Sequence, residues 1–133
     1  MRTFKAFLFA LAALTPSMLP ASPADVSFSQ PAAQIARFDY VEISATVGAP
    51  DARNPFVDAS LLGTLETADG SHHWAVEGFC DTADGSVFRI RFMAPLAGDY
   101  KYSVTYKQGS FTKSSSGTFR AVEAQKRGLL GVA

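Results

Sequence analysis

The sequence predicts an all-β protein: an immunoglobulin-like antiparallel β-sandwich of about seven strands, preceded by a signal peptide. Three observations support this fold class. Apolar and polar residues alternate in successive short segments, which is the period of half-buried strands. Turn signals separate these segments at intervals of about 8–12 residues. Apolar residues do not recur at helical spacing over the ten or so residues that a helix needs.

The N-terminal segment has the layout of a secretory signal peptide. Arg2 and Lys5 precede an apolar run over residues 6–14, and a Pro/Ser-rich stretch follows. The run is well short of the roughly 20 residues that cross a bilayer as a helix. We therefore predict that residues 1–24 are removed, with a cut after Ala21 as the alternative. The mature chain would then have no membrane span and would be exported, to the periplasm or outside the cell.

Charge and cysteine content narrow the possible partners. The chain has 12 basic and 12 acidic residues, and no segment forms a basic stripe. Loss of Arg2 and Lys5 would leave a slight acidic excess, which argues against nucleic acid and anionic membranes as partners. Cys80 is the single cysteine, so no intramolecular disulfide can form. We interpret it as a small, buried apolar side chain, although a reactive thiol is the alternative.

The first part of the mature chain is predicted to lead into the sandwich. Residues 25–36 are mixed in character and are interpreted as a leader with at most an edge strand, before a sandwich over residues 37–123. Residues 37–47 alternate as a half-buried strand. Its apolar side carries Val41, Ile43, Ala45 and Val47. Residues 48–56 contain Gly48, Pro50 and Pro55, which a central strand cannot hold, and are predicted to be a loop.

The next two strands form a predicted hairpin. Residues 58–67 alternate, and Ala68-Asp69-Gly70 is a turn signal because Asp and Gly tolerate positive φ. Residues 71–79 follow, with Trp74 and Val76 on one side. The acidic segment 80–86 is predicted to be a loop.

The most strongly patterned stretch is 86–106, predicted as two strands joined at Pro95 and Gly98. The apolar phase carries Phe88, Ile90 and Phe92, then Tyr100, Tyr102, Val104 and Tyr106. We interpret this phase as the inner face of the sandwich. Residues 108–117 are predicted to be a polar loop with at most a short strand. Residues 118–124 form the last strand, and residues 124–133 are predicted to be an exit segment.

No catalytic, cofactor or metal site is predicted. His72 and His73 are adjacent on a strand, so their side chains point to opposite faces and do not converge on an ion. Asp81 and Asp84 lie in one short loop and are interpreted as turn residues, with a calcium site as the minor alternative. Nothing around Cys80 resembles a cysteine-enzyme signature.

The candidate binding or interdomain surface consists of Trp74, Arg89, Arg91, Asp81 and Asp84. Trp74 could anchor a sugar ring, but a buried position in the sandwich is favoured. Tyr102 is interpreted as a tyrosine corner, whose hydroxyl caps an upstream backbone group. Arg89 and Arg91 project away from the core. They could pair with Glu77 or Glu66, or face a partner domain.

Several motifs together resemble a known family. They are an Asn-Pro-Phe-x-Asp segment, a Gly-Phe-x-Asp loop, an Arg-Phe strand end followed by Pro, Gly and Tyr-x-Tyr, and a final Gly-x-Phe. The matching residues are Asn54, Pro55, Phe56, Asp58, Gly78, Phe79, Asp81, Arg91, Phe92, Pro95, Gly98, Tyr100, Tyr102, Gly117 and Phe119. Over residues 38–132 the chain resembles the immunoglobulin-like domain of unknown function at the N-terminus of secreted proteins classed as apiosidase-like glycoside hydrolases.

The resemblance implies an accessory module without the enzyme. Cys80 replaces the usual aromatic residue of the Gly-Phe loop, and the glycine expected after Asp81 is displaced to Gly85. Arg127 stands where such proteins tend to have histidine, and the chain stops where their catalytic barrel would begin. The implied role is to pack against, or assist, a glycoside hydrolase catalytic domain. The alternative is a free-standing module that binds a polysaccharide.

Overall fold

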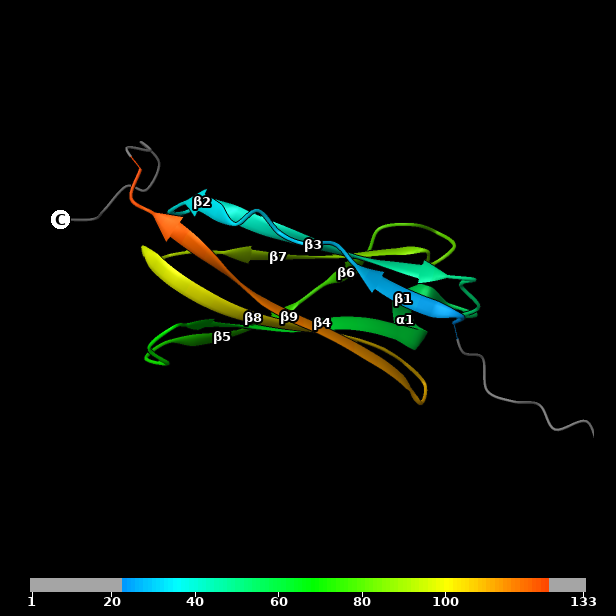
Figure 1. Ribbon diagram of the computed structural model, residues 1–133. Helices are drawn as coiled ribbons and strands as arrows, with labels where there is room; N and C mark the ends of the chain where they lie inside the picture. The colour runs from blue at the N-terminus through cyan, green and yellow to red at the C-terminus, as the bar shows by residue number, and fades with distance from the viewer. Residues whose placement is uncertain (1–22, 125–133) are drawn as a thin grey trace, which may run out of the picture.

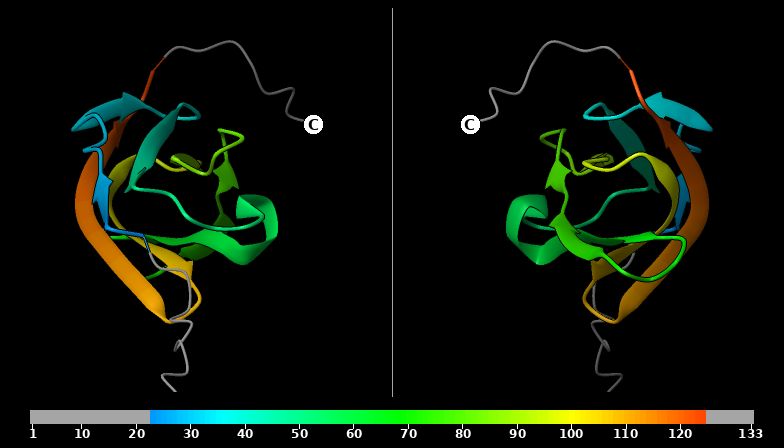
Figure 2. Two further views of the ribbon diagram at one scale, coloured as in Figure 1. Left: turned by 90° about the vertical axis from the view of Figure 1, so that its right-hand side faces the viewer. Right: turned by 90° about the vertical axis from the view of Figure 1, so that its left-hand side faces the viewer.

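Two facing β-sheets make up the structure, a computed structural model that describes residues 23–124. Figure 1 shows the two layers from the side, and Figure 2 shows the sandwich from its two ends. The all-β prediction is confirmed. Most of the predicted signal peptide (1–22) and most of the predicted exit segment (125–133) lie outside the described residues.

One sheet has four strands in the order β1-β3-β7-β6, and the other has five in the order β2-β9-β8-β4-β5. The strands of the first sheet are β1 (Asp25–Phe28), β3 (Tyr40–Gly48), β7 (Val87–Met93) and β6 (Phe79–Cys80). Those of the second are β2 (Gln34–Ala36), β9 (Phe111–Val122), β8 (Gly98–Gln108), β4 (Ala59–Thr67) and β5 (His73–Glu77). All these pairings are antiparallel except the parallel pairing of β2 with β9. This is the arrangement of an immunoglobulin-like sandwich.

The sandwich begins earlier than the sequence predicts. Residues 25–36, expected to be a leader, contribute both β1 and β2. β1 pairs with β3 from Asp25↔Gly48 to Phe28↔Ala45, and Val26 is fully buried. Strands of three or four residues are too short for alternation to reveal them, so the boundary predicted at residue 37 shifts to Asp25.

The segment predicted as a polar loop, 108–117, is largely strand. β9 pairs with β8 along its length, from Gly98↔Ala121 to Gln108↔Phe111, with the hairpin turn at Gly109 in the left-handed region (φ 56°). Serine and threonine side chains alternate between exposed and half-buried positions there. Their polar composition hides the strand, because alternation cannot be detected when both faces are polar.

The core lies on the alternating faces that the sequence indicates. Buried side chains come mainly from β3, β4, β7, β8 and β9, with Val26 from β1; they include Val41, Ile43, Ala45, Val47, Leu61, Leu65, Phe88, Ile90, Phe92, Tyr100, Tyr102, Val104, Tyr106, Phe119 and Ala121. Aromatic rings fill the space between the sheets. Tyr100 and Phe119, neighbours in one sheet, are parallel with centroids 5.1 Å apart, and Phe88 of the other sheet meets Tyr106 edge-on at 5.2 Å. The predicted inner face of 86–106 is therefore confirmed.

Figure 1 shows that β7 and β8, the two strands of that stretch, lie in different layers. The connection between them is held by Tyr100 rather than by the predicted Tyr102. The Tyr100 hydroxyl donates to the Leu96 carbonyl at 2.7 Å and accepts from the Leu96 N–H at 3.0 Å. The Tyr102 ring instead lies against Gly117, where an added Cβ would come within 2.6 Å of the Tyr102 hydroxyl oxygen.

A buried polar chain fixes the other end of β8. The Tyr106 hydroxyl donates to Gln108 Oε1 at 2.9 Å, and Gln108 Nε2 donates to Asp51 at 2.8 Å. Burial raises the pKa of Tyr106 to about 12, with the nearby charge of Asp51 adding to the effect. The chain of bonds attaches the loop after β3 to the core, because each buried polar group needs its partner.

We expect Tyr100→Phe to lower the free energy of unfolding by about 2 kcal/mol, because it removes one donor and one acceptor from the backbone of a part-buried turn. The matched control is Tyr102→Phe, whose hydroxyl makes no hydrogen bond within residues 23–124. That variant should lose less than about 0.5 kcal/mol. Urea unfolding at constant m-value measures both, and equal losses would contradict the role given to Tyr100.

Candidate functional site

A single helical turn, α1 (Pro55–Asp58), holds two apolar side chains out in solvent. Asn54 caps the turn: its side chain accepts from the Phe56 N–H at 3.2 Å, and the Asp58 carboxylate accepts from the Asn54 N–H at 2.8 Å. Pro55 takes the first helical position, where a missing N–H costs nothing. The predicted loop 48–56 thus ends in helix, and Phe56 and Val57 are 64% and 77% exposed.

These two side chains begin an apolar band across one side of the molecule. We define the band by the exposed side chains of Phe56, Val57, Leu62, Phe79, Tyr40 and Met93. The first four line a cleft of about 430 Å³ between α1, β4 and β6. Tyr40 on β3 and Met93 on β7 are cross-strand neighbours on the outer face of the four-stranded sheet. Six of the seven large exposed apolar residues in 23–124 belong to this band, which is more than scattered exposure would give.

Arg91 lies at the centre of the band. Its guanidinium carbon is 5.3 Å from the Tyr40 ring centroid and 5.4 Å from that of Phe79, within the range of cation–π attraction. Arg91 also donates to Glu42 Oε2 at 2.7 Å. The ion therefore joins two aromatic rings that come from different strands into one continuous surface.

A network of charges adjoins Arg91. Arg89 donates to Glu42 at 2.8 Å, to Asp81 at 2.6 Å and to Ser44 at 2.9 Å. The hydrogen bond from Arg91, followed by that from Arg89, lowers the pKa of Glu42. The hydrogen bond to Asp81, followed by that to Glu42, raises the pKa of Arg89, and the hydrogen bond to Glu42 raises the pKa of Arg91.

A shallow groove of about 380 Å³ opens where β5 passes β7. We call it the edge groove; it is lined by Leu65, Trp74, Ala75, Val76, Arg91, Met93 and Pro95. Trp74 is half-buried and packs against the core. The His72 ring stacks on it at 6.0 Å and 11°, and Tyr100 lies at 6.2 Å. Trp74 is thus a wall of the groove rather than an open sugar platform.

The structure brings together most of the predicted surface residues. Arg89, Arg91 and Asp81 form one network, but their link is Glu42 on β3 and not Glu66 or Glu77. Glu42 was missed because the pairing of β3 with β7 cannot be read from the sequence. Phe88, Ile90 and Phe92 face the core. The alternating side chains of Arg89 and Arg91 therefore face outward, as the sequence predicts.

The other residues considered in the sequence do not join this network. Asp84 accepts from the backbone and hydroxyl of Ser86 at 3.0 and 2.7 Å, which lowers its pKa and makes it a turn residue. His72 and His73 are both exposed. Cys80 is half-buried, and its thiol donates to the Thr82 carbonyl at 3.1 Å. Within residues 23–124 no group of three metal-ligating side chains converges, and no helix is long and apolar enough to span a membrane.

Sequence reasoning also missed the band itself. Tyr40, Phe79 and Met93 are apolar residues that fall on the outward phase of their strands, each next to an inward or half-buried neighbour. That break in the alternation was the available signal. Phe56 gave no such signal, because its exposure depends on the cap at Asn54.

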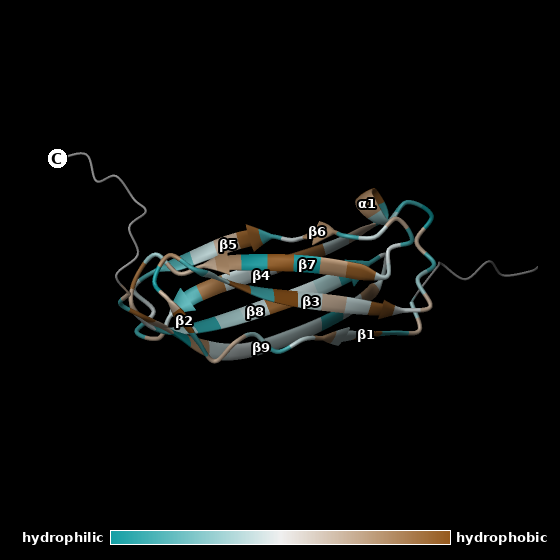
Figure 3. Ribbon diagram, turned by 90° about the horizontal axis from the view of Figure 1, so that it is seen from above, coloured by the Kyte–Doolittle hydropathy of each residue, from teal (hydrophilic) through white to brown (hydrophobic). Residues whose placement is uncertain are grey.

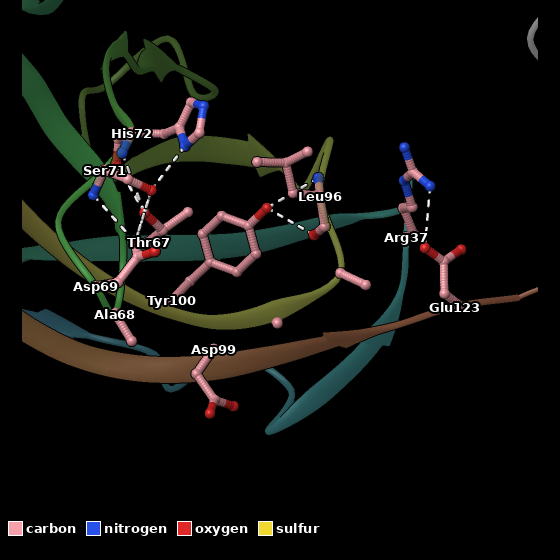
Figure 4. Close-up of a pocket in the computed structure, with 12 residues that line it drawn as sticks. Arg37, Thr67, Ala68, Asp69, Ser71, His72, Leu96, Asp99, Tyr100 and Glu123 are labelled. Atoms are coloured by element: carbon pink, nitrogen blue, oxygen red, sulfur yellow. Dashed lines mark hydrogen bonds and ion pairs between the residues drawn. The ribbon is translucent and has the colours of Figure 1, made fainter.

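A third hollow, which we call the end pocket, has a volume of about 580 Å³ and lies beside the end of β9. Figure 4 shows the residues that line it. Asp69 accepts there from the Ser71 N–H at 3.0 Å and from the Thr67 and Ser71 hydroxyls at 2.7 Å. These bonds, with that from the Ser71 backbone first, lower the pKa of Asp69 to about 2. Arg37 pairs with Glu123 at 3.0 Å. These polar groups are already engaged within the chain, so we assign the pocket a structural role.

The fold and the band define an immunoglobulin-like β-sandwich domain with an exposed apolar surface. The chain belongs to the family described as a domain of unknown function, DUF5060, which matches residues 34–107. The predicted resemblance is confirmed at this level. No curated protein matches the chain.

Three solved structures are similar to this chain. A "putative glycoside hydrolase" from Bacteroides vulgatus is 31% identical with a TM-score of 0.55 over 70% of this chain, which spans only 17% of the length of that protein. A conjugative transposon lipoprotein from Bacteroides eggerthii is 14% identical with a TM-score of 0.42, covering 71% of this chain and 93% of that one. The Lin-41 filamin domain is 15% identical with a TM-score of 0.47, covering 78% and 100%.

Glu42→Gln should destabilise the domain at neutral pH by up to about 1 kcal/mol, the scale of a partly exposed ion-pair network. Because the folded pKa of Glu42 lies below its ordinary value of 4.5, its contribution is present above that value and is lost as pH falls through the folded pKa. The difference between parent and variant should therefore vanish in acid. Thermal unfolding across pH measures it.

The matched control for that experiment is Glu123→Gln. Glu123 also pairs with an arginine, but its side chain is 67% exposed against 27% for Glu42. We expect no measurable loss in this variant. A Glu42→Gln loss that did not change with pH would contradict an electrostatic role for Glu42.

Proposed function

We propose that this chain is a non-catalytic, exported accessory domain that packs against the catalytic domain of a glycoside hydrolase of the apiosidase-like type. The observation that carries the proposal is the apolar band of six exposed apolar side chains, two of which, Tyr40 and Phe79, lie against Arg91. A surface of this kind is what one domain buries against another.

The comparison with the Bacteroides vulgatus protein supports the choice of partner. That protein carries the name of a glycoside hydrolase, and the segment similar to this chain is 17% of it. The rest of its length offers room for a separate catalytic part. Export is proposed from the signal-peptide layout of residues 1–24, with the periplasm or the cell exterior as destination.

The face with the band is suited to docking for a physical reason. The charges of Glu42, Asp81, Arg89 and Arg91 cancel, and each arginine has a carboxylate partner within 2.8 Å. Covering this surface leaves no unpaired ion, so the desolvation cost of burying it is reduced. Phe56 and Val57, at the far end of the band, stand on a capped turn and lose little conformational freedom on binding.

We expect this chain to bind the catalytic domain of a glycoside hydrolase encoded beside its gene, and Phe56→Ala combined with Tyr40→Ala to weaken that binding at least tenfold, since buried aromatic anchors dominate interfaces. Isothermal titration calorimetry measures the affinity. The control variant is Lys101→Ala, on the exposed face of β8 in the other sheet. Equal affinity of the band variant would refute the proposal.

A second candidate function is binding of a free polysaccharide. Tyr40 and Phe79 are 57% and 42% exposed, and Arg91 between them offers donors that a sugar hydroxyl accepts from. Trp74, the anchor that the sequence suggests for this function, has the His72 ring stacked on it and is the weaker choice.

Affinity electrophoresis on a panel of polysaccharides separates the two functions. If this second function holds, at least one glycan retards the chain, Phe79→Ala abolishes the retardation, and Trp74→Ala keeps it. Retardation that is lost only in Trp74→Ala would restore the tryptophan as anchor. No retardation on any glycan leaves the docking role as the proposed function.

A further inference from the structure

One edge of β7 is only partly covered. β7 pairs with β3 over seven residues, from Val87 to Met93, but β6 pairs with it only at Phe88 and Arg89. Figure 3 shows β5 and β6 following one another along this edge. β5 belongs to the other sheet, where it pairs with β4, so no strand within residues 23–124 pairs with β7 beyond Arg89 on this side.

The direction of the main-chain groups follows from bonds at both ends of β7. The Ala94 N–H donates to Asp39 of the chain leading into β3, and Ser86 accepts from Val47 of β3. Val87 accepts from Asp81, just after β6. Because alternate residues of a strand direct their N–H and C=O groups to the same side, those of Arg91 and Met93 point to the open edge.

Gly78 is the reason that the edge is open. Its N–H donates to Leu61 of β4 at 2.7 Å, and an added Cβ would lie 2.7 Å from the Arg89 carbonyl oxygen. The chain crosses from one sheet to the other at this point, and only after it does β6 begin. Within residues 23–124, the main chain of β7 past Arg89 is left without a hydrogen-bonded strand on this side, and β5 lies beside it across the edge groove.

We propose that this open edge binds an extended segment of another polypeptide, which adds as a strand beside Arg91 and Met93. Strand addition satisfies the free main-chain groups and places alternate side chains on the two faces. Side chains on the inner phase would enter the edge groove against Leu65 and Trp74. The segment is therefore apolar at these positions.

The charge pattern specifies the residue opposite Arg91. Arg89 has a carboxylate on each side, Glu42 on β3 and Asp81 after β6, whereas Arg91 has Glu42 alone among the described residues. An acidic residue of the added strand would complete the same arrangement at Arg91. The occupant is thus an apolar–acidic–apolar strand.

A second copy of this chain is a poorer occupant than such a segment. A two-fold antiparallel pairing of β7 with β7 about Arg91 would bring two guanidinium groups opposite each other, which is destabilising. The inference concerns the backbone edge and holds whether or not the partner is a glycoside hydrolase, so its test does not use that enzyme.

The probe is a synthetic octapeptide with the sequence of residues 40–47, Tyr-Val-Glu-Ile-Ser-Ala-Thr-Val, which carries the required pattern and already pairs with β7 from the other side as part of β3. In the ¹⁵N-labelled chain we expect the peptide to slow hydrogen exchange of the Arg91 and Met93 amides. Replacing its glutamate by lysine should weaken binding at least tenfold.

The decisive experiment reverses the charges of Arg91 and of the peptide glutamate together. Arg91→Glu should lose the parent peptide and bind the lysine peptide, whereas Arg120→Glu, a reversal on β9 in the other sheet, should behave as the parent chain. Met93→Pro removes one N–H group from the open edge and should weaken the binding of both peptides. Thermal unfolding checks that each variant is folded.

Three results would overturn the inference. They are protection of amides away from Arg91 and Met93, equal binding of the two peptides, and dimerisation of the chain through this edge, detected by sedimentation and abolished by Met93→Pro.

Discussion

Aromatic packing on the inner face of β8 is the constraint on which the sandwich depends. Tyr100, Tyr102 and Tyr106 project from one strand into the space between the sheets, and each meets a phenylalanine: Phe119, Phe92 and Phe88 respectively. Two of those partners lie on β7 in the opposite sheet, so the rings hold the layers together. With no disulfide available, this layer supplies much of the buried apolar area.

The same strand explains why the stretch 86–106 is one functional unit. β7 belongs to one sheet and β8 to the other, and the Tyr100 hydroxyl fixes the turn between them. The inward phase of β7 is thereby committed to the core. The outward-facing residues of β7, Arg89, Arg91 and Met93, must then face solvent, so the place of Arg91 and Met93 at the band is a consequence of the core.

The sequence was sufficient to predict most strands of the two sheets, but it was insufficient to predict which residues meet on the surface. Alternation located β3, β4, β7 and β8 because each has one apolar face, and it also located the end of β9 from Thr118. It failed for the first part of β9, whose Ser114 to Ser116 are polar on both faces, and for the short β1 and β2. It placed Arg89 and Arg91 outside. It could not find Glu42 as their partner, because register between β3 and β7 is a long-range property. The wrong choice of Tyr102 in place of Tyr100 has the same origin. The sequence does not show which of the two hydroxyls reaches the turn, because this depends on how the two sheets are placed.

The crossing at Gly78 connects the core to the surface proposed to bind. A side chain there would press on the Arg89 carbonyl, so glycine lets β5 leave one sheet edge and β6 join the other within a single residue. Two consequences follow together. Phe79 is directed outward, where it meets Arg91 and the cleft beside α1, and β7 past Arg89 loses its strand neighbour. An apolar surface and an unpaired edge therefore adjoin because one backbone crossing produces both, and a partner that covers the band is already placed to pair with the edge.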